Sequence, residues 1–374
     1  MCSRGSAMTV AEDFNFEASV KDALREALKE RGHVNILIAG RTGVGKSTLI
    51  NAVFQGNFAT TGQGRPVTQD TRELKKEGIP LSIFDTRGLE MADFTKTLDA
   101  LKSLVGERAR SRDSNQHIHV AWICIAEDFR RVEPAEEELV KMLVDRNIPV
   151  IAVITKARSD QGFRAEVLKI LPLVSNAVKV RAIQEEDDEG NILKPKGLNE
   201  LVTATMEVVP EGLKRAFTAA QKVDIELKKT QSHVIVAAAA VSAAASAAVP
   251  IPFSDVVAIV PIQVGMLAGI SATFGLSIDK SFLGTVVGSI IAGAGGTLAR
   301  RTIVASLLKM IPGAGSVVGG TIAAATAAAL TIAFGEAYIA ALDMLFVNNN
   351  GEPPTSEEVA EAFKKKCSQL SIIK

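Results

Sequence analysis

The stretch GRTGVGKSTLIN, at residues 40–51, constrains this chain more than any other feature. It matches the phosphate-binding pattern G-x-x-x-x-G-K-[ST] in full. The preceding run Val34–Gly40 is apolar and β-branched and predicts a buried strand, and Lys46–Phe54 predicts a helix. A glycine-rich loop between a strand and a helix can wrap around a phosphate with its backbone N–H groups pointing inward. We therefore expect a nucleotide to bind here.

Two side chains of this loop have specific predicted roles. Lys46 is expected to meet the β- and γ-phosphates. The hydroxyl of Ser47 is expected to bind Mg²⁺, which prefers hard oxygen ligands. The nucleotide-binding residues predicted in the loop are Gly40, Arg41, Thr42, Gly43, Val44, Gly45, Lys46, Ser47 and Thr48.

Apolar strands alternate with helical patterns through the first half of the chain. The further predicted strands are Leu81–Thr86, His119–Ala126, Pro149–Thr155 and Ala177–Ile183. The predicted helices between them are Phe94–Glu107, Pro134–Asp145, Arg164–Leu173 and Leu198–Val208. This order predicts an α/β fold with a parallel sheet covered on both faces, whose ligand lies outside the carboxyl ends of the strands. His117 and His119 alternate in an apolar segment and are expected to be structural.

Charge is spread unevenly along the chain. Lys and Arg number 42 and Asp and Glu number 42, so the net charge is zero and direct DNA binding is not expected. Residues 233–346 carry very few of these charges, which marks a boundary near residue 230. The expected organisation is an N-terminal helical extension (1–32), an α/β domain (33–208), a helical connector (209–232), an Ala-rich helical domain (233–347) and an amphipathic tail (348–374).

Cysteine usage and the N-terminus bear on location. The three cysteines lie far apart, fit neither a disulfide framework nor a zinc site, and favour a reducing compartment. The opening MCSRGSAMTV lacks the apolar run of a signal peptide, so secretion is not expected.

Four further segments resemble, in the usual order, the remaining motifs of Ras-like GTPases, especially Era-like and septin-like members. GRPVTQDT resembles switch I, FDTRG resembles D-x-x-G, VITKARSD resembles [NT]-K-x-D, and VRAI resembles the last motif. The resemblance covers residues 33–208. It implies a Ras-like P-loop sheet, GTP or GDP with Mg²⁺ as ligands, and GTPase activity; ATP is the alternative nucleotide.

At the phosphate end, the resemblance implies a metal site and a γ-phosphate site. Thr68 would reach both Mg²⁺ and the γ-phosphate, Asp85 would lie behind the metal, and the Gly88 amide would meet the γ-phosphate. The implied metal ligands are Ser47, Thr68 and Asp85.

At the base end, this chain departs from the family pattern. Thr155 and Lys156 match the motif, and the Ala182 amide would meet the guanine oxygen. The family's aspartate position is occupied by Arg158, and the nearest acid is Asp160, two residues further on. Asp160 is expected either to read guanine from a longer loop or to be a solvated loop acid.

The hydrolytic machinery also departs from the family. Ras-like enzymes orient water with a glutamine where this chain has Leu89, and Gly43 replaces the asparagine with which some relatives hold potassium. Slow hydrolysis is therefore expected, accelerated by a partner or by a homodimer through this domain. Arg41 and Arg87 flank the phosphates and are either charge-neutralising fingers or solvated side chains. The expected catalytic residues are Lys46, Thr68, Gly88, Arg41 and Arg87.

The second half reads as helical and rich in small residues. Uncharged runs occupy Val234–Ser254, Val256–Ile278, Ser281–Ala299 and Met310–Gly335. Each is about as long as the ~20 residues that a helix needs to cross a bilayer. Because Ala, Gly, Ser and Thr predominate, a soluble, closely packed bundle would read the same way. The final segment, Pro354–Lys374, predicts an amphipathic helix that packs Val359, Ala362 and Phe363 against the protein.

Basic residues flank these runs, which favours a membrane with its cytoplasmic face toward them. They are Lys214, Arg215, Lys222, Lys228, Lys229, Arg300, Arg301, Lys309, Lys364, Lys365 and Lys366. The expected location is thus the cytoplasmic face of a membrane, with the cytosol as the alternative.

The second half also resembles the uncharacterised C-terminal domain of a group of mostly bacterial GTPases, through PIPFSDVVAIVPIQVGML and IPGAGSVVGG. The layout loosely resembles immunity-related and dynamin-like GTPases. These resemblances favour a nucleotide-dependent switch or remodeller at a membrane. The alternatives are a soluble Era-like GTPase in ribosome or complex assembly and a nucleotide-binding scaffold with little turnover.

Overall fold

The computed structural model describes residues 22, 25–27, 29–58, 72–86, 94–159, 161–187, 189–247, 254–276, 281–282, 284–286 and 320–369. The chain divides into two compact units, Gly32–Asp224 and a second that combines Met1–Arg31 with Ile225–Lys374. The junction at Asp224 and Ile225 falls inside the connector proposed from the sequence, residues 209–232.

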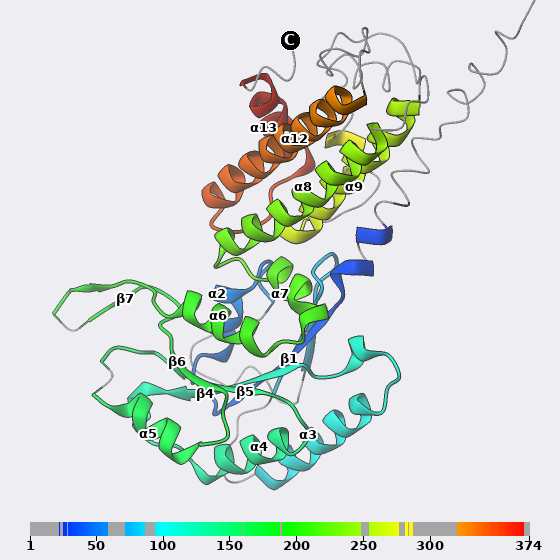
Figure 1. Cartoon of the computed structure of the whole chain (residues 1–374). Helices are drawn as coiled ribbons and strands as arrows, with labels where there is room; N and C mark the ends of the chain where they lie inside the picture. The colour runs from blue at the N-terminus through cyan, green and yellow to red at the C-terminus, as the bar shows by residue number, and fades with distance from the viewer. Residues whose placement is uncertain are drawn as a thin grey trace, which may run out of the picture. The chain divides into compact units, whose positions relative to one another are not determined.

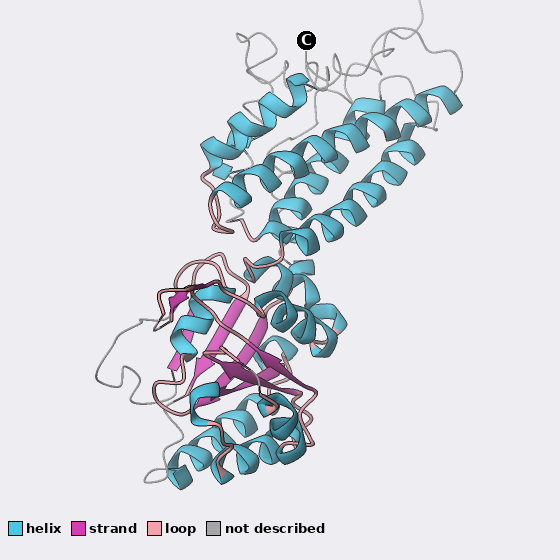
Figure 2. Cartoon of the chain, turned by 90° about the vertical axis from the view of Figure 1, so that its left-hand side faces the viewer, coloured by secondary structure: helices cyan, strands magenta, loops and turns pink. Residues whose placement is uncertain are grey.

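The first unit is built on a six-stranded sheet with the strand order β2-β3-β1-β4-β5-β6 (Figures 1 and 2). The strands are β1 (Val34–Gly40), β2 (Arg72–Lys75), β3 (Leu81–Asp85), β4 (Val120–Ala126), β5 (Val150–Thr155) and β6 (Asn176–Lys179). A small hairpin, β7 (Glu185–Glu186) and β8 (Ile192–Leu193), follows. The buried, near-continuous apolar runs of β1, β3, β4 and β5 are typical of parallel strands covered on both faces.

The predicted parallel sheet carries one antiparallel edge strand, which the sequence did not indicate. β2 pairs antiparallel with β3, whereas the other neighbours in this sheet are parallel. β2 reads RELK and is largely exposed, so it carries no apolar signal. The predicted strand Ala177–Ile183 is also shorter than expected, because after Lys179 the backbone of Arg181 pairs with Lys196 instead.

Helices cover both faces of this sheet (Figure 1). On one side lie α3 (Phe94–Ala109), α4 (Pro134–Val144) and α5 (Phe163–Ile170); on the other lie α2 (Lys46–Val53), α6 (Leu198–Val208) and α7 (Lys214–Ala220). The fold class predicted for this half, a Ras-like sheet with helices on both faces, is confirmed.

A single tryptophan anchors the α2 and α6 side. The ring of Trp122, from β4, stacks on Phe54 with centroids 5.5 Å apart, and Phe54 meets Phe217 edge-on at 6.1 Å. The buried Trp122 Nε1–H donates to Thr205 Oγ1 of α6 at 3.1 Å, so the polar end of the indole is satisfied.

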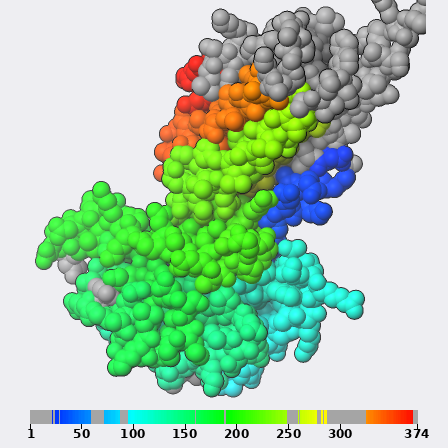
Figure 3. All heavy atoms as spheres, in the orientation of Figure 1, coloured from blue at the N-terminus to red at the C-terminus, as the bar shows by residue number. Residues whose placement is uncertain are grey.

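The described part of the second unit is helical, as predicted. It contains α8 (Ile225–Ala247), α9 (Ser254–Phe274), α12 (Gly320–Asn348) and α13 (Ser356–Gln369). Figure 3 shows α8 and α12 side by side. Their ion pairs, Lys229 with Asp343 at 3.4 Å and His233 with Glu336 at 2.9 Å, show that the two helices run antiparallel. Most of the predicted run Ser281–Ala299 lies outside the described residues.

Small residues allow these helices to approach closely. A Cβ added to Gly335 of α12 would lie 2.5 Å from Cγ2 of Val236 on α8, so only glycine fits there. The amphipathic tail is confirmed: α13 buries Val359, Ala362 and Phe363.

The structure places Lys228 differently from the other described basic residues that flank the apolar runs, because its side chain is buried. The sequence places it among basic residues expected to face anionic lipid, but it is fully buried, and its Nζ donates to the carbonyl of Phe274, at the end of α9, at 3.2 Å. This carbonyl belongs to the last turn of a helix, where backbone acceptors lack partners within the helix and a cation is favoured.

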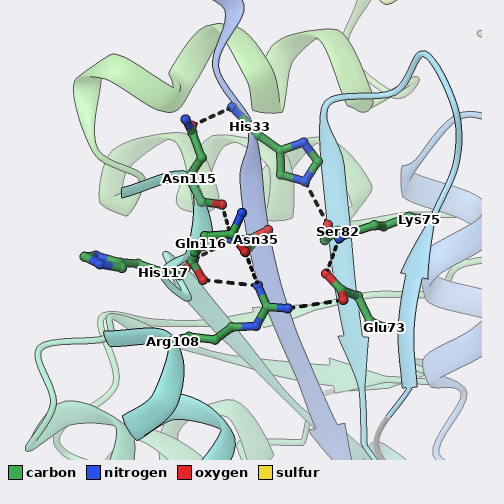
Figure 4. Close-up of polar contacts among 9 residues, drawn as sticks. All are labelled: His33, Asn35, Glu73, Lys75, Ser82, Arg108, Asn115, Gln116 and His117. Atoms are coloured by element: carbon green, nitrogen blue, oxygen red, sulfur yellow. Dashed lines mark hydrogen bonds and ion pairs between the residues drawn. The ribbon is translucent and has the colours of Figure 1, made fainter. Parts of the chain in front are cut away.

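The amino edge of the sheet holds a polar network (Figure 4). The side-chain amide of Asn35 donates to the carbonyls of Asn115 and His117, at 2.7 and 2.6 Å. The Asn35 backbone N–H donates to Nδ1 of His119 at 2.9 Å, and Nε2 of His117 lies 2.9 Å from the Ser111 carbonyl. Both histidines therefore tie backbone segments together, as expected for structural residues, on the edge opposite the phosphate-binding loop.

Candidate nucleotide-binding site

The phosphate-binding loop lies where β1 ends and α2 begins, at the carboxyl edge of the sheet. Gly40 is required by close approach, because a Cβ there would lie 2.3 Å from the carbonyl oxygen of Cys124 on β4. Gly45, directly before α2, has a φ of 96°, which side chains rarely tolerate. The start of the loop therefore packs directly against the neighbouring strand β4, and its end turns sharply into α2. A backbone that surrounds a phosphate needs this tight path.

Lys46 lies across this loop. It is largely buried, and its Nζ donates to the carbonyls of Gly40 and Arg41 at 2.8 and 3.1 Å. The ammonium group is thereby held over the concave side of the loop. Ser47 and Thr48 follow in the first turn of α2 and are partly exposed.

The predicted metal-binding residues are described in part. Asp85 is the last residue of β3, is buried, and pairs in register with Ile38 of β1. β1 leads directly into the loop that carries Ser47, so the carboxylate and the hydroxyl come from neighbouring strand ends. These are the hard oxygen donors that Mg²⁺ prefers. Thr68 lies outside the described residues, as do Arg87 and Gly88.

Thr155 joins the phosphate loop to the loop that follows β5. Its buried Oγ1–H donates to the carbonyl of Val44 at 2.6 Å. Lys156 then adopts a left-handed conformation with φ 53°, and the chain turns away from the sheet. The Ala157 N–H donates to the Val180 carbonyl at 3.1 Å, which fixes this turn against the end of β6. We call Lys156–Ser159 the base loop.

The last predicted motif lies beside the base loop. Arg181, which precedes Ala182, donates from Nε to the Ala157 carbonyl at 3.1 Å and from a terminal nitrogen to the Lys194 carbonyl at 2.8 Å. The structure therefore places the backbone that carries Thr155 and Lys156 beside the segment that carries Ala182. Asp160 lies outside the described residues.

Arg41 and Arg158 are each paired with an acid. A guanidinium nitrogen of Arg41 lies 3.2 Å from Glu133, and its carbon lies 5.2 Å from the centre of the Phe129 ring. Arg158, at the family's aspartate position, directs Nε toward Glu185 at 3.4 Å.

Sequence reasoning did not single out the connection between β4 and α4, residues 127–133. Glu127 and Arg130 contact the base loop, whereas Phe129 and Glu133 contact Arg41. The only available signal was the position of Glu127, an acid directly after a buried strand at the ligand edge of the sheet. In α4, burial raises the pKa of Glu136 to about 7, the hydrogen bond from the Glu133 N–H opposes this rise, and the Glu133 carboxylate adds to it.

Comparisons with known families identify both halves. Residues 35–156 match the family described as 50S ribosome-binding GTPase, and residues 214–367 match a domain of unknown function, DUF697. The chain thus consists of a GTPase domain followed by an uncharacterised helical domain.

The curated relatives described next cover between 32% and 53% of the chain. The tRNA modification GTPase MnmE of Treponema denticola is 28% identical over 123 residues, covering 32% of this chain and 25% of that protein. Septin-14 of Mus musculus is 26% identical over 226 residues, covering 53% and 52%. GTPase Der of Rhizobium johnstonii is 31% identical over 134 residues, covering 34% and 27%. The chain therefore spans about half the length of these relatives, or less.

The chain is also similar to solved structures. One is Era of Aquifex aeolicus bound to GDP.AlF4⁻, with 23% sequence identity and a TM-score of 0.35, covering 47% of this chain and 57% of that one. Toc33 of Arabidopsis thaliana in complex with Mg²⁺ and GMPPNP has 18% identity, a TM-score of 0.35 and coverage of 55% and 94%.

Proposed function

We propose, on the premise that residues 35–156 form a GTPase domain, that this protein binds GTP and GDP with Mg²⁺ and hydrolyses GTP slowly. The observation that carries the proposal is a direct link between the strand that leads into the base loop and the phosphate loop: the hydroxyl of Thr155, the last residue of β5, donates to the carbonyl of Val44 at 2.6 Å. One rigid arrangement can thus receive the phosphates at one end and the base at the other.

The residues of the loop supply the phosphate contacts. Backbone N–H groups of residues 40–47 and the N-terminus of α2 favour an anion. Lys46 already lies over the loop and would exchange its carbonyl contacts for phosphate oxygens. Ser47 and Asp85, with Thr68, would hold Mg²⁺, which neutralises charge on the phosphates when bound.

Slow hydrolysis follows from two features. Leu89 cannot orient water, and Arg41 is occupied by Glu133 instead of being directed to the phosphates. Acceleration then requires an event that supplies a cation, such as a partner, release of Arg41, or Arg87 from a second copy.

Phosphate release from GTP tests this part directly. The full chain should release phosphate slowly, and Lys46→Ala should abolish both release and GDP binding, because it removes the central cation. Lys141→Ala, at an exposed position on α4, is the matched control and should behave as the unaltered protein. Equal GDP affinity in the Lys46 and Lys141 variants would contradict the proposal.

We further propose that the helical unit attaches this switch to the cytoplasmic face of a membrane. Two segments, Ile225–Ala247 and Ala324–Asn348, are long and apolar enough to cross a membrane by length and composition, which is weak support alone. The placement of charge adds a second observation. Among described residues, the ion pairs between α8 and α12 involve Lys229, His233, Glu336 and Asp343, at one end of this antiparallel pair.

The other end of the pair is uncharged. Residues 234–247 of α8 and 320–335 of α12 contain no Asp, Glu, Lys or Arg. On this end Val241 is 71% exposed and Ile332 is 44% exposed. Fourteen helical residues span about 21 Å, less than the ~30 Å hydrocarbon core, so this end would enter a bilayer without crossing it.

Flotation of the full chain with liposomes, in GTP and in GDP, tests attachment. Val241→Asp places a charge on the exposed uncharged end and should abolish flotation. Thr230→Asp, exposed at the charged end of the same helix, is the control and should float. A full chain that stays unbound in both nucleotides would refute attachment. Sedimentation with ribosomes instead would favour the assembly role suggested by the family description, and GTP binding without turnover under any condition would favour a scaffold.

A further inference from the structure

Glu127 is buried at the edge of the sheet where the base loop lies. It directly follows β4 and is only 3% exposed. Its Oε2 accepts two backbone hydrogen bonds from the base loop, from the N–H of Arg158 at 2.6 Å and from that of Ser159 at 3.0 Å. Arg158 is the position at which related GTPases have an aspartate, so a carboxylate contacts this point of the loop although the loop itself has an arginine.

The remaining backbone of the base loop is held by two arginines, one from the same connection as Glu127 and one from the segment after β6. Arg130 donates to the Ser159 carbonyl at 2.8 Å, and Arg181 donates to the Ala157 carbonyl at 3.1 Å. These contacts offset the conformational cost at Lys156, whose left-handed backbone (φ 53°) is unfavourable for a residue with a side chain. A backbone held this firmly beside a ligand position is preorganised for recognition.

The second carboxylate oxygen of Glu127 indicates that this residue does more than stabilise the fold. Oε1 is buried and has no hydrogen-bond partner among the described residues. A buried carboxylate with an unsatisfied oxygen costs free energy, so such a group in a native structure calls for a functional reason. Its position against the base loop supplies one.

The same connection also reaches the phosphate loop. Glu133 and Phe129, in the segment 127–133 that contains Glu127, contact Arg41. One short segment therefore contacts both loops that would enclose the nucleotide.

We infer that Glu127 is a positioning residue for guanine recognition, replacing the missing aspartate by fixing the backbone of residues 157–159 against the base. This inference rests on the proposed binding of guanine nucleotides. It makes base selectivity depend on a carboxylate outside the [NT]-K-x-D motif. Selectivity, and not phosphate affinity, is therefore the property that loss of Glu127 changes.

The test measures dissociation constants of GDP, IDP and ADP for the full chain and its variants. Glu127→Gln keeps the shape of the side chain but removes the charge that two N–H groups share. Its GDP affinity should fall about tenfold or more, the loss expected when hydrogen bonds to a charged group are weakened. Its ADP affinity should not change, so the preference for GDP shrinks by the same factor. Arg130→Ala should shift the preference in the same direction by a smaller factor.

Glu137→Gln, an exposed position on α4, controls for loss of one carboxylate and should keep the preference of the unaltered protein. Unchanged preference in Glu127→Gln, or an equal loss for GDP and ADP, would overturn the inference. The inference would also be overturned if Asp160→Asn lost the preference for GDP over ADP and gained binding of xanthosine diphosphate, while Glu127→Gln kept the preference. Failure of the unaltered chain to prefer GDP over ADP would instead refute the proposed function itself.

Discussion

Replacement of Gly40 by alanine tests the packing of the phosphate-binding loop. The new Cβ would lie 2.3 Å from the Cys124 carbonyl oxygen, 3.1 Å from its Cβ and 3.2 Å from its carbonyl carbon. The first of these distances is far below a van der Waals contact. Cys124 cannot move away easily, because β4 is paired with β1 on one side and with β5 on the other.

Two terms set the expected size of the effect. Forcing a side chain into a close-packed contact costs about 1–3 kcal/mol and occasionally more. The backbone at Gly40, with φ 149°, adds about 1–3 kcal/mol for a residue that carries a Cβ. We therefore expect Gly40→Ala to lower the free energy of unfolding of the first unit by about 3–5 kcal/mol.

Two other glycines separate these terms. Gly43 has φ 79° and no atom within 4 Å of an added Cβ, so Gly43→Ala should cost only the conformational term, about 1–2 kcal/mol. Gly106 lies within α3 with equally open space and no positive φ, so Gly106→Ala should stabilise by about 0.5–1 kcal/mol.

The assay is denaturant unfolding followed by tryptophan fluorescence. The chain has one tryptophan, Trp122, which is buried in β4, so the signal reports the first unit even in the full chain. A loss for Gly40→Ala no larger than that for Gly43→Ala would refute the reasoning, because it would show that the contact with Cys124 is absent.

Three further predictions follow from polar contacts of the site. Thr155→Val should weaken GDP binding about tenfold in a titration, because it leaves the Val44 carbonyl without its hydroxyl donor; unchanged affinity would contradict this. Glu133→Gln should release Arg41 and raise single-turnover GTP hydrolysis severalfold with little effect on stability, since partly exposed ion pairs contribute ~0–1 kcal/mol; an unchanged rate would remove Arg41 from the catalytic residues. Burial raises the pKa of Glu136 from 4.5 to about 7, so the folded state holds this proton more tightly than the unfolded state does. The free energy of unfolding should therefore fall as pH rises between these two values. Glu136→Gln should abolish this part of the pH dependence of unfolding, and parallel pH curves for the two proteins would argue against it.

The buried strands and the loop glycines could be predicted from sequence because each leaves a local signal. β1, β4 and β5 are unbroken apolar runs, and Gly40 and Gly45 stand at the fixed spacing of a phosphate loop. β2 could not be found this way. It is polar and exposed, and it exists only because β3 offers an antiparallel partner at the sheet edge.

The base loop shows a different limit of sequence reasoning. Its departure at Arg158 was visible, but the groups that hold it come from residues 127–130 and 181, about 30 residues before and 20 after, which only the sheet brings together. Lys228 shows the same limit in the helical unit. Its charge suggested a surface position, whereas a carbonyl at the end of α9, distant in sequence, provides a buried partner.

Calorimetric titration of the full chain with GDP and with ADP, each with Mg²⁺, tests the central claim most directly. If the phosphate loop and the base loop form one guanine nucleotide site, GDP should bind with a stoichiometry near one and at least about a hundredfold more tightly than ADP, the ~3 kcal/mol that hydrogen-bonded recognition of one base can supply. Equal affinity for the two nucleotides, or no heat with either, would contradict the account.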